Sequence, residues 1–191
     1  MSSKLIFTLL IACAALPGCA YRLDMSERSL PGGYTQVAIP MFQNLSTDVG
    51  IEANFTNSLI RQFASSQVAR VTNKESSPLI LYGTIQKVVT LQGAAVNNKS
   101  SQLPTLPEQA VLTTEYRLVV TTDLILVRKS DEKQLWRGSF RNEKVYAPPR
   151  IGSAVVNSAN ATYNHSVRME TLSRLADEMM EEAHDRMTEN F

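Results

Sequence analysis

Cysteine, histidine and long apolar runs are scarce in this sequence. Its 191 residues include two cysteines and two histidines, and no apolar run reaches the roughly 20 residues that a membrane-spanning helix needs. Neither His165 nor His184 has a second histidine or a cysteine at ligand spacing, and no serine lies in a nucleophile-elbow pattern. We therefore expect a protein that is not an enzyme and holds no metal or cofactor. A hydrolase is a weak alternative, because the sequence shows no catalytic set.

Neither sign of charge predominates. The chain has 19 Lys and Arg residues against 18 Asp and Glu residues, for a formal net charge of +1. Proteins that bind nucleic acids present a strongly basic surface. We therefore expect no nucleic-acid partner.

The N-terminus has the pattern of a secretory signal. Lys4 precedes a short apolar run over residues 5–16, which as a helix would rise about 18 Å and could not span a hydrocarbon core of about 30 Å. The run ends in Leu16-Pro17-Gly18-Cys19, which resembles a lipobox. We expect residues 1–18 to be a lipoprotein signal peptide and Cys19 to be the lipid attachment site. The alternative is an ordinary signal peptide with a cysteine near its cleavage site.

Processing at this site would leave no free thiol. Cys13 would leave with the signal and Cys19 would be acylated, so no disulfide and no cysteine metal site could form. Residues 19–33 are polar and end in Leu30-Pro31-Gly32-Gly33, so they predict a lipidated tether. Residues 34–191 suit a single domain with one core. The protein would therefore contact the membrane through its lipid anchor.

The apolar periodicity predicts an order of strand, helix, three strands and helix. Ile51, Phe55, Leu59 and Phe63 recur every four residues and predict a helix that Thr47 or Asp48 could cap. Alternating residues predict strands over 34–39, 79–89, 113–127 and 134–145, the last two forming an antiparallel hairpin. A final amphipathic helix is expected from about residue 166 to residue 188. Residues 92–112 and 146–164 are expected to be irregular, and so long a loop is commonly functional or disordered.

These elements predict an α+β fold. A four-stranded, mostly antiparallel or mixed sheet would have two helices packed on one face. Its other face would stay open to water or to a partner.

Basic residues on the predicted strands are the candidate binding residues. Arg117, Arg137 and Arg141 alternate with the core-facing positions, and Lys87 falls in the same sheet region. Guanidinium groups on the open face could bind phosphate through paired hydrogen bonds. The alternative is an ordinary charged face on which acidic side chains neutralise them, namely Glu115, Asp123 and Glu143.

Several short segments occur in a distinctive order along the chain. They are Cys19-Ala20-Tyr21-Arg22-Leu23, Leu30-Pro31, Val37-Ala38-Ile39-Pro40-Met41-Phe42-Gln43-Asn44, Gly50-Ile51-Glu52, Glu115-Tyr116-Arg117-Leu118 and Leu135-Trp136. With the amphipathic C-terminal helix, this order resembles the LptE (rare lipoprotein B) family of outer-membrane lipopolysaccharide-assembly lipoproteins. The resemblance covers essentially the whole chain after the signal.

The resemblance implies a fold of two helices on a four-stranded sheet and a non-enzymatic role. It implies a plug inside an LptD-like outer-membrane β-barrel that helps the barrel assemble and binds lipopolysaccharide. Lys87, Arg117, Arg137 and Arg141 are then candidates for contact with lipid phosphates. Ala20 is expected to favour the outer membrane, because the familiar inner-membrane retention signal is Asp after the acylated cysteine. A rival hypothesis is an outer-membrane lipoprotein that faces the periplasm and regulates a peptidoglycan synthase or forms part of a secretion channel.

Overall fold

The computed structural model describes residues 28–97, 111–113, 115–147 and 161–189. The expected signal peptide, Cys19 and most of the expected tether lie outside these residues. The predictions made for them therefore stay predictions.

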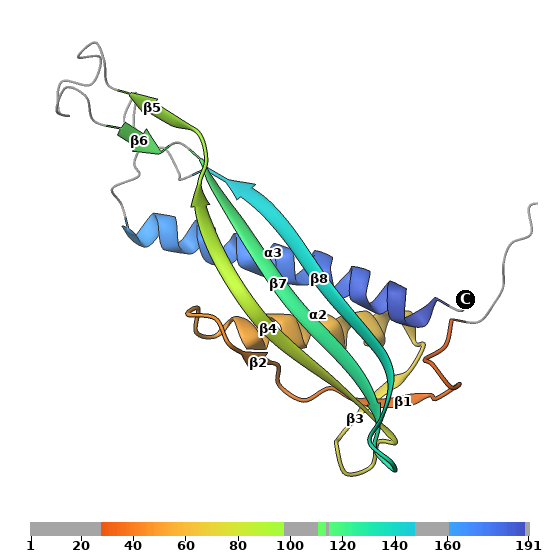
Figure 1. Ribbon diagram of the computed structural model, residues 1–191. Helices are drawn as coiled ribbons and strands as arrows, with labels where there is room; N and C mark the ends of the chain where they lie inside the picture. Colours follow the sequence, from red (N-terminus) through yellow and green to blue (C-terminus); the bar gives the residue numbers. More distant parts are fainter. Residues whose placement is uncertain (1–27, 98–110, 114, 148–160, 190–191) are drawn as a thin grey trace, which may run out of the picture.

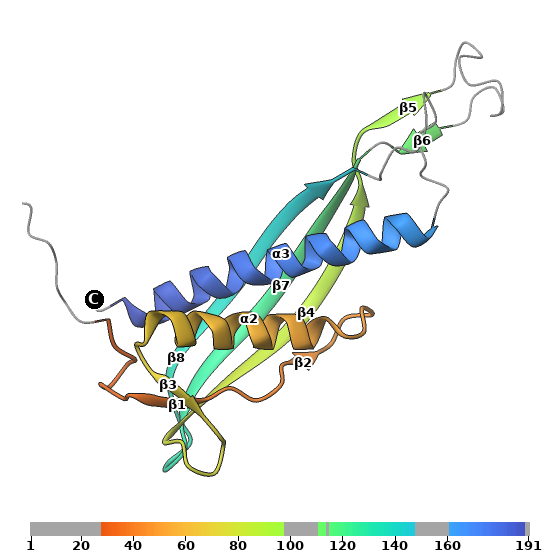
Figure 2. The same ribbon diagram turned by 180° about the vertical axis from the view of Figure 1, so that it is seen from behind.

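Two helices form one layer of the fold (Figure 2). Helix α2 spans Ile51–Ser66 and buries Ile51, Phe55, Leu59 and Phe63, as its four-residue spacing predicts. Helix α3 spans Ala161–Thr188 and packs against α2. It begins about five residues earlier than its apolar pattern indicates, because its first turns are polar and give no periodic signal.

The predicted cap of α2 is wrong. The N-cap position is Gly50, with a φ of 92° and no side-chain cap hydrogen bond. The Glu52 carboxylate accepts the Gly50 backbone N–H at 3.1 Å and the Asn44 side-chain N–H at 2.9 Å. Backbone hydrogen bonding at Glu52 itself and the bond from Asn44 lower the pKa of Glu52. Gly50 tolerates the left-handed backbone conformation that the start of α2 requires.

The main sheet has six strands rather than the predicted four. The strands are β1 (Gln36–Ala38), β2 (Gln43–Asn44), β3 (Arg70–Thr72), β4 (Leu79–Gln92), β7 (Tyr116–Arg128) and β8 (Lys133–Tyr146). Their order is β3-β1-β4-β7-β8, and β2 pairs with β4. The pairs β1–β3, β1–β4 and β2–β4 are parallel, whereas β4–β7 and β7–β8 are antiparallel. Strands β2 and β3 are too short to show the alternation by which strands are predicted.

A second, two-stranded sheet lies beyond the N-terminal end of α3 (Figure 1). Strands β5 (Ala95–Asn97) and β6 (Val111–Thr113) pair antiparallel. The expectation that residues 92–112 are irregular throughout is therefore wrong at both ends of that stretch. Residues 98–110 lie outside the described part of the chain, as do residues 148–160 of the second expected irregular stretch.

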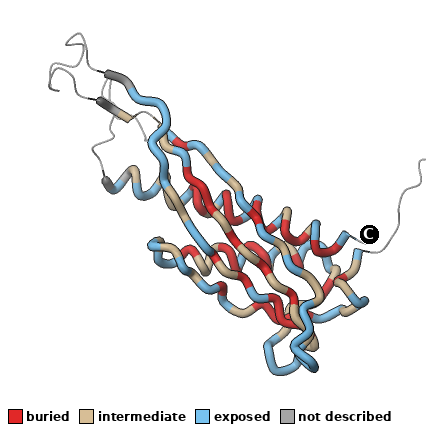
Figure 3. The backbone as a smooth tube through the Cα atoms, in the orientation of Figure 1, coloured by how far each residue is buried: buried red, intermediate tan, exposed pale blue. Residues whose placement is uncertain are grey.

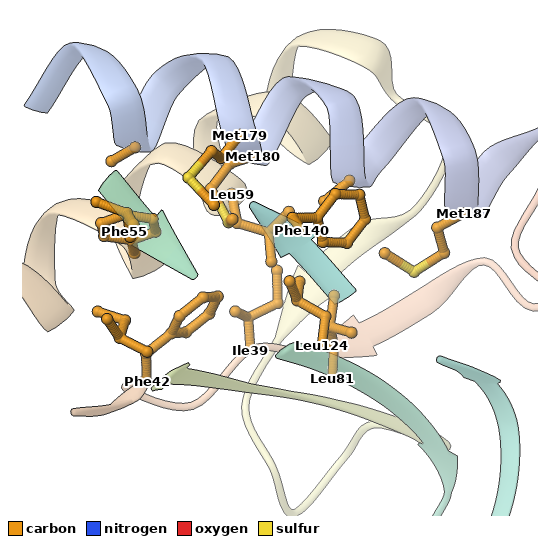
Figure 4. Packing of buried hydrophobic residues seen from close by; sticks show 14 of the residues in the cluster. Ile39, Phe42, Phe55, Leu59, Leu81, Leu124, Phe140, Met179, Met180 and Met187 are labelled. Atoms are coloured by element: carbon orange, nitrogen blue, oxygen red, sulfur yellow. The ribbon is translucent and has the colours of Figure 1, made fainter. Parts of the chain in front are cut away.

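The core fills the space between the helices and one face of the main sheet. Figure 4 shows Phe55 and Leu59 of α2, Met179, Met180 and Met187 of α3, and strand residues such as Leu81, Leu124 and Phe140 converging in this layer. Both helices lie on the same side, so the other face of β4, β7 and β8 is left uncovered by described elements (Figures 1 and 2). This arrangement confirms the predicted layers. In Figure 3 the buried positions gather along β7 and along the helices behind it.

The contact between Phe42 and Gly83 packs the segment after β1 closely against β4. A Cβ atom on Gly83 would lie 2.3 Å from ring carbons of Phe42. Only glycine therefore lets this ring, which is 3% exposed, lie against the strand.

Candidate binding face of the open sheet

A β-bulge decides which side of the sheet Lys87 occupies. Ile85 pairs with Thr122 and Lys87 pairs with Thr121, so Gln86 is an extra residue in β4. Before the bulge, Ile85 faces the core. After it, Val88 packs against the core, so its neighbours Lys87 and Val89 lie on the open face. Uninterrupted alternation from Leu79 would instead have directed Lys87 inward.

Lys87 and Arg141 flank one position of the central strand. Thr121 of β7 pairs with Lys87 of β4 on one side and with Arg141 of β8 on the other. The two basic residues are thus separated by two strand spacings, about 10 Å between backbones. Both are exposed. Within the described chain, neither has a hydrogen-bond or ion-pair partner.

The other two candidate residues have acidic partners. Arg117 Nη1 lies 3.2 Å from Glu143 Oε1. Arg137 Nη2 lies 4.0 Å from Asp123 Oδ2. The structure therefore brings all four predicted residues to one face but divides them, because Arg117 and Arg137 match the alternative of a neutralised charged face.

Asp123 is the centre of a small polar network that lies beside Lys87 and Arg141. Besides its contact with Arg137, it accepts hydrogen bonds from Ser139 Oγ at 2.6 Å and from Gln86 Nε2 at 2.9 Å. Gln86 is the extra residue of the bulge. This network ties the bulge to β7 and β8 and neutralises the part of the face next to Thr84.

A hollow of about 350 Å³ lies on the open face beyond this network. Lys87, Thr121 and Arg141 line one part of it, and three apolar side chains line the rest, namely Val89, Leu91 and Val119. Two cations that have no partner among the described residues, together with a hydroxyl, suit an anionic group, and the apolar part suits hydrocarbon. The apolar lining is a feature that the sequence analysis missed, because it depends on the inversion at Gln86.

A separate cluster has the residue types of a catalytic triad. His184 Nε2 lies 2.8 Å from Ser66 Oγ, and its Nδ1 lies 3.3 Å from Asp185 Oδ1. Ser66 is the last residue of α2, and its hydroxyl also lies 3.4 Å from the Phe63 carbonyl. An oxyanion needs N–H donors, whereas a helix C-terminus presents carbonyls and partial negative charge.

This cluster connects chain segments instead. Arg28 Nη1 pairs with Asp185 Oδ1 at 3.0 Å, which ties the segment before β1 to the end of α3. The Ser66 contact ties α2 to α3 at the same place. The geometry gives the hydrolase alternative no support.

Among residues 28–97, 111–113, 115–147 and 161–189, no group of three His, Cys, Asp or Glu residues is arranged to hold a metal ion. No helix in the same described ranges has the length and apolar character needed to cross a bilayer.

A comparison with known protein families identifies the family of this chain. Residues 34–188 match the family described as LptE, lipopolysaccharide-assembly. This chain belongs to the LptE family. The match covers both helices and both sheets, so the resemblance based on short segments is confirmed. The protein is thus a lipopolysaccharide-assembly lipoprotein in the general sense of that family, whose members are non-enzymatic.

Similarity to individual LptE-like and other lipoproteins is distant. The rare lipoprotein B of Shewanella oneidensis is 15% identical with a TM-score of 0.37, covering 80% of this chain and 89% of that one. PelC of Paraburkholderia phytofirmans, solved as a dodecamer, is 12% identical with a TM-score of 0.48, covering 82% and 90%. A minor lipoprotein from Acinetobacter baumannii is 12% identical with a TM-score of 0.44, covering 80% and 92%. No curated protein matches the sequence significantly.

Proposed function

We propose that this LptE family member is a non-enzymatic, lipid-anchored protein of the outer membrane that plugs an LptD-like β-barrel. In this role it helps the barrel assemble and binds lipopolysaccharide during its insertion into the outer leaflet. The observation that carries the proposal is the open sheet face, on which Lys87 and Arg141 have no acidic partner among the described residues and lie beside an apolar hollow.

The chemistry of this face suits a phosphorylated glycolipid. Arg141 can donate two parallel hydrogen bonds to one phosphate, and Lys87 adds a second positive charge. Their side chains extend from opposite sides of Thr121, so a single anionic group above Thr121 can contact both. Ion pairing supports this pair over the other two candidates, because Arg117 and Arg137 have acidic neighbours.

The family and the N-terminal sequence support the proposed anchor and barrel. A plug has to stay near its barrel, and acylation of Cys19 would hold it at the membrane. Ala20 in place of Asp supports the outer membrane as the destination. The uncovered face would then meet the barrel wall or the lipid that passes through the lumen.

Paired charge reversals test lipopolysaccharide binding. Lys87→Glu with Arg141→Glu should reduce binding of lipopolysaccharide by the detergent-solubilised lipoprotein at least tenfold. Arg117→Glu with Arg137→Glu makes the same change in charge on the same face and should have the smaller effect. Asp123→Asn should act in the opposite direction and tighten binding about two- to fivefold, because it releases Arg137 from an exposed ion pair. Equal losses for both double variants would show a general effect of charge and contradict the proposed site.

Partner recovery tests the barrel. The protein, purified with its bound partners from outer membranes, should carry a large β-barrel, and its depletion should block lipopolysaccharide transport. Recovery of a peptidoglycan synthase or of secretion-channel subunits instead would favour the rival function.

A further inference from the structure

We infer that the hollow binds a phosphorylated lipid in one direction, with the phosphate between Lys87 and Arg141 and an acyl chain along Val89, Val119 and Leu91 toward the β5–β6 sheet. This inference rests on the proposed function for the class of ligand. It adds the second half of the site, which is a hydrocarbon subsite, and the orientation of the lipid.

The two halves of the hollow are ordered along the strands. On β4, Lys87 comes first, and Val89 and Leu91 follow on the same face toward Gln92, where the strand ends before β5. Val89 pairs with Val119 of β7, so the two valines form a continuous apolar floor beside the cations. The distance from residue 87 to residue 91 along the strand is about 13 Å. A lipid whose headgroup lies at Thr121 can therefore place about that length of chain on apolar side chains.

Charge complementarity determines which end holds the headgroup. The apolar end offers a phosphate no attractive charge, because Arg117 beside it is paired with Glu143 and the Glu115 carboxylate lies next to Gly93, just beyond Leu91. On the opposite side, the Asp123 network pairs Arg137 with a carboxylate, so that guanidinium is not free to bind a phosphate. An anionic headgroup therefore belongs between Lys87 and Arg141, and the chain has only the Leu91 direction available.

The exposure of Leu91 supports a hydrocarbon site on the open face. Its side chain is 48% exposed, although it belongs to the lining of a hollow. Val145 of β8 is 47% exposed on the same face but does not line the hollow. These two residues give a matched pair for the test, since either can be made polar with little effect on the core.

The experiment uses alkyl phosphates as probes. The whole mature chain with Cys19→Ser, which carries no acyl anchor of its own, is titrated with octyl, decyl and dodecyl phosphate below their micelle concentrations. Affinity should rise with chain length, by up to about fourfold per methylene that becomes buried. Dodecyl maltoside and dodecyl trimethylammonium should bind at least tenfold more weakly than dodecyl phosphate. Equal affinities for octyl and dodecyl phosphate would overturn the hydrocarbon subsite.

Variants should separate the two halves. Leu91→Asn should flatten the dependence on chain length and leave the preference for phosphate over maltoside. Arg141→Gln should remove that preference and leave the dependence on chain length. Val145→Asn should change neither. If Leu91→Asn and Val145→Asn behave alike, the apolar subsite is wrong.

A nitroxide at the end of the dodecyl chain tests the direction. In NMR spectra the nitroxide should broaden the amide signals of residues near Leu91 and leave those near Asp123 unchanged. The opposite pattern would show that the lipid binds in the reverse orientation. If lipopolysaccharide binding still depends on Lys87 and Arg141 but the affinity for alkyl phosphates does not depend on chain length, this inference alone is rejected. Loss of both dependences would reject the proposed binding function as well.

Discussion

Arg168 and Asp48 form a bidentate ion pair that joins the N-terminal part of α3 to the loop before α2, although they are 120 positions apart in the sequence. The guanidinium donates from Nη1 to Oδ1 at 2.5 Å and from Nη2 to Oδ2 at 2.8 Å. The side chains are only 21% and 16% exposed. The hydrogen bonds to Asp48 are the largest cause of the raised pKa of Arg168. Asp48 thus ties the N-terminal part of α3 to the loop before α2, and does not cap α2 as its position suggests.

Breaking this pair should destabilise the fold. Asp48→Asn leaves the guanidinium partly buried without its counter-charge, so the free energy of unfolding should fall by about 1–3 kcal/mol. Urea denaturation at neutral pH measures the change. Arg174→Ala is the control, because its i,i+4 pair with Glu170 is exposed and should contribute about 0.5 kcal/mol or less. Equal effects of the two substitutions would show that the Asp48 pair behaves as an ordinary surface pair.

Gly83→Ala should strain the contact between β4 and Phe42. The new methyl group would lie 2.3 Å from the ring, so the ring or the strand must move. We expect a loss of about 1–3 kcal/mol, typical of overpacking in a core. Thermal denaturation of Gly83→Ala alone and together with Phe42→Leu measures it, since the smaller side chain should recover part of the loss. A neutral Gly83→Ala would mean that Phe42 relocates freely.

His184 should make stability depend on pH. Burial lowers its pKa below the ordinary value of about 6.5, despite the opposing effect of Asp185. The unfolded chain then binds a proton at pH values where the folded chain does not. The free energy of unfolding should therefore decrease as pH falls below about 6.5, down to the folded-state pKa. Midpoints of denaturation measured from pH 8 to pH 5 show this slope.

Substitution of His184 separates its contribution to the pH dependence of stability from that of other titratable groups. His184→Gln should remove part of the slope below pH 6.5, although it also loses the edge contact between the imidazole and Phe63. His165→Gln, at an exposed position of α3, is the matched control for the loss of an imidazole. An unaltered slope in His184→Gln would assign the acid sensitivity to other groups.

Cys19 should carry the lipid anchor. Mass spectrometry of the mature protein should find an acylated cysteine as the first residue, and Cys19→Ser should abolish both acylation and membrane association. An unmodified N-terminus at any other residue would remove the anchor from the proposed function and with it the reason for a tethered plug.

The apolar pattern of the sequence determined the main elements. The four-residue spacing of α2 and the alternation in β7 and β8 predict a helix and a hairpin, because these periods reflect which side of each element is buried. The segment order was enough to indicate the LptE family. Lys87, Arg117, Arg137 and Arg141 could be placed on strands for the same reason. The short strands β2 and β3 were not predicted, because they contain only two and three residues and pair with strands far away in the chain.

Only the tertiary structure decided which basic residues are available and what lies beside them. The extra residue at Gln86 inverts the alternation of β4, so that Lys87, Val89 and Leu91 reach the open face. Cross-strand register then puts Arg117 near Glu143 and Arg137 near Asp123, and leaves Lys87 and Arg141 on either side of Thr121. The physical reason is that local periodicity reports burial along one segment, whereas register and ion pairing depend on neighbours brought together by the sheet.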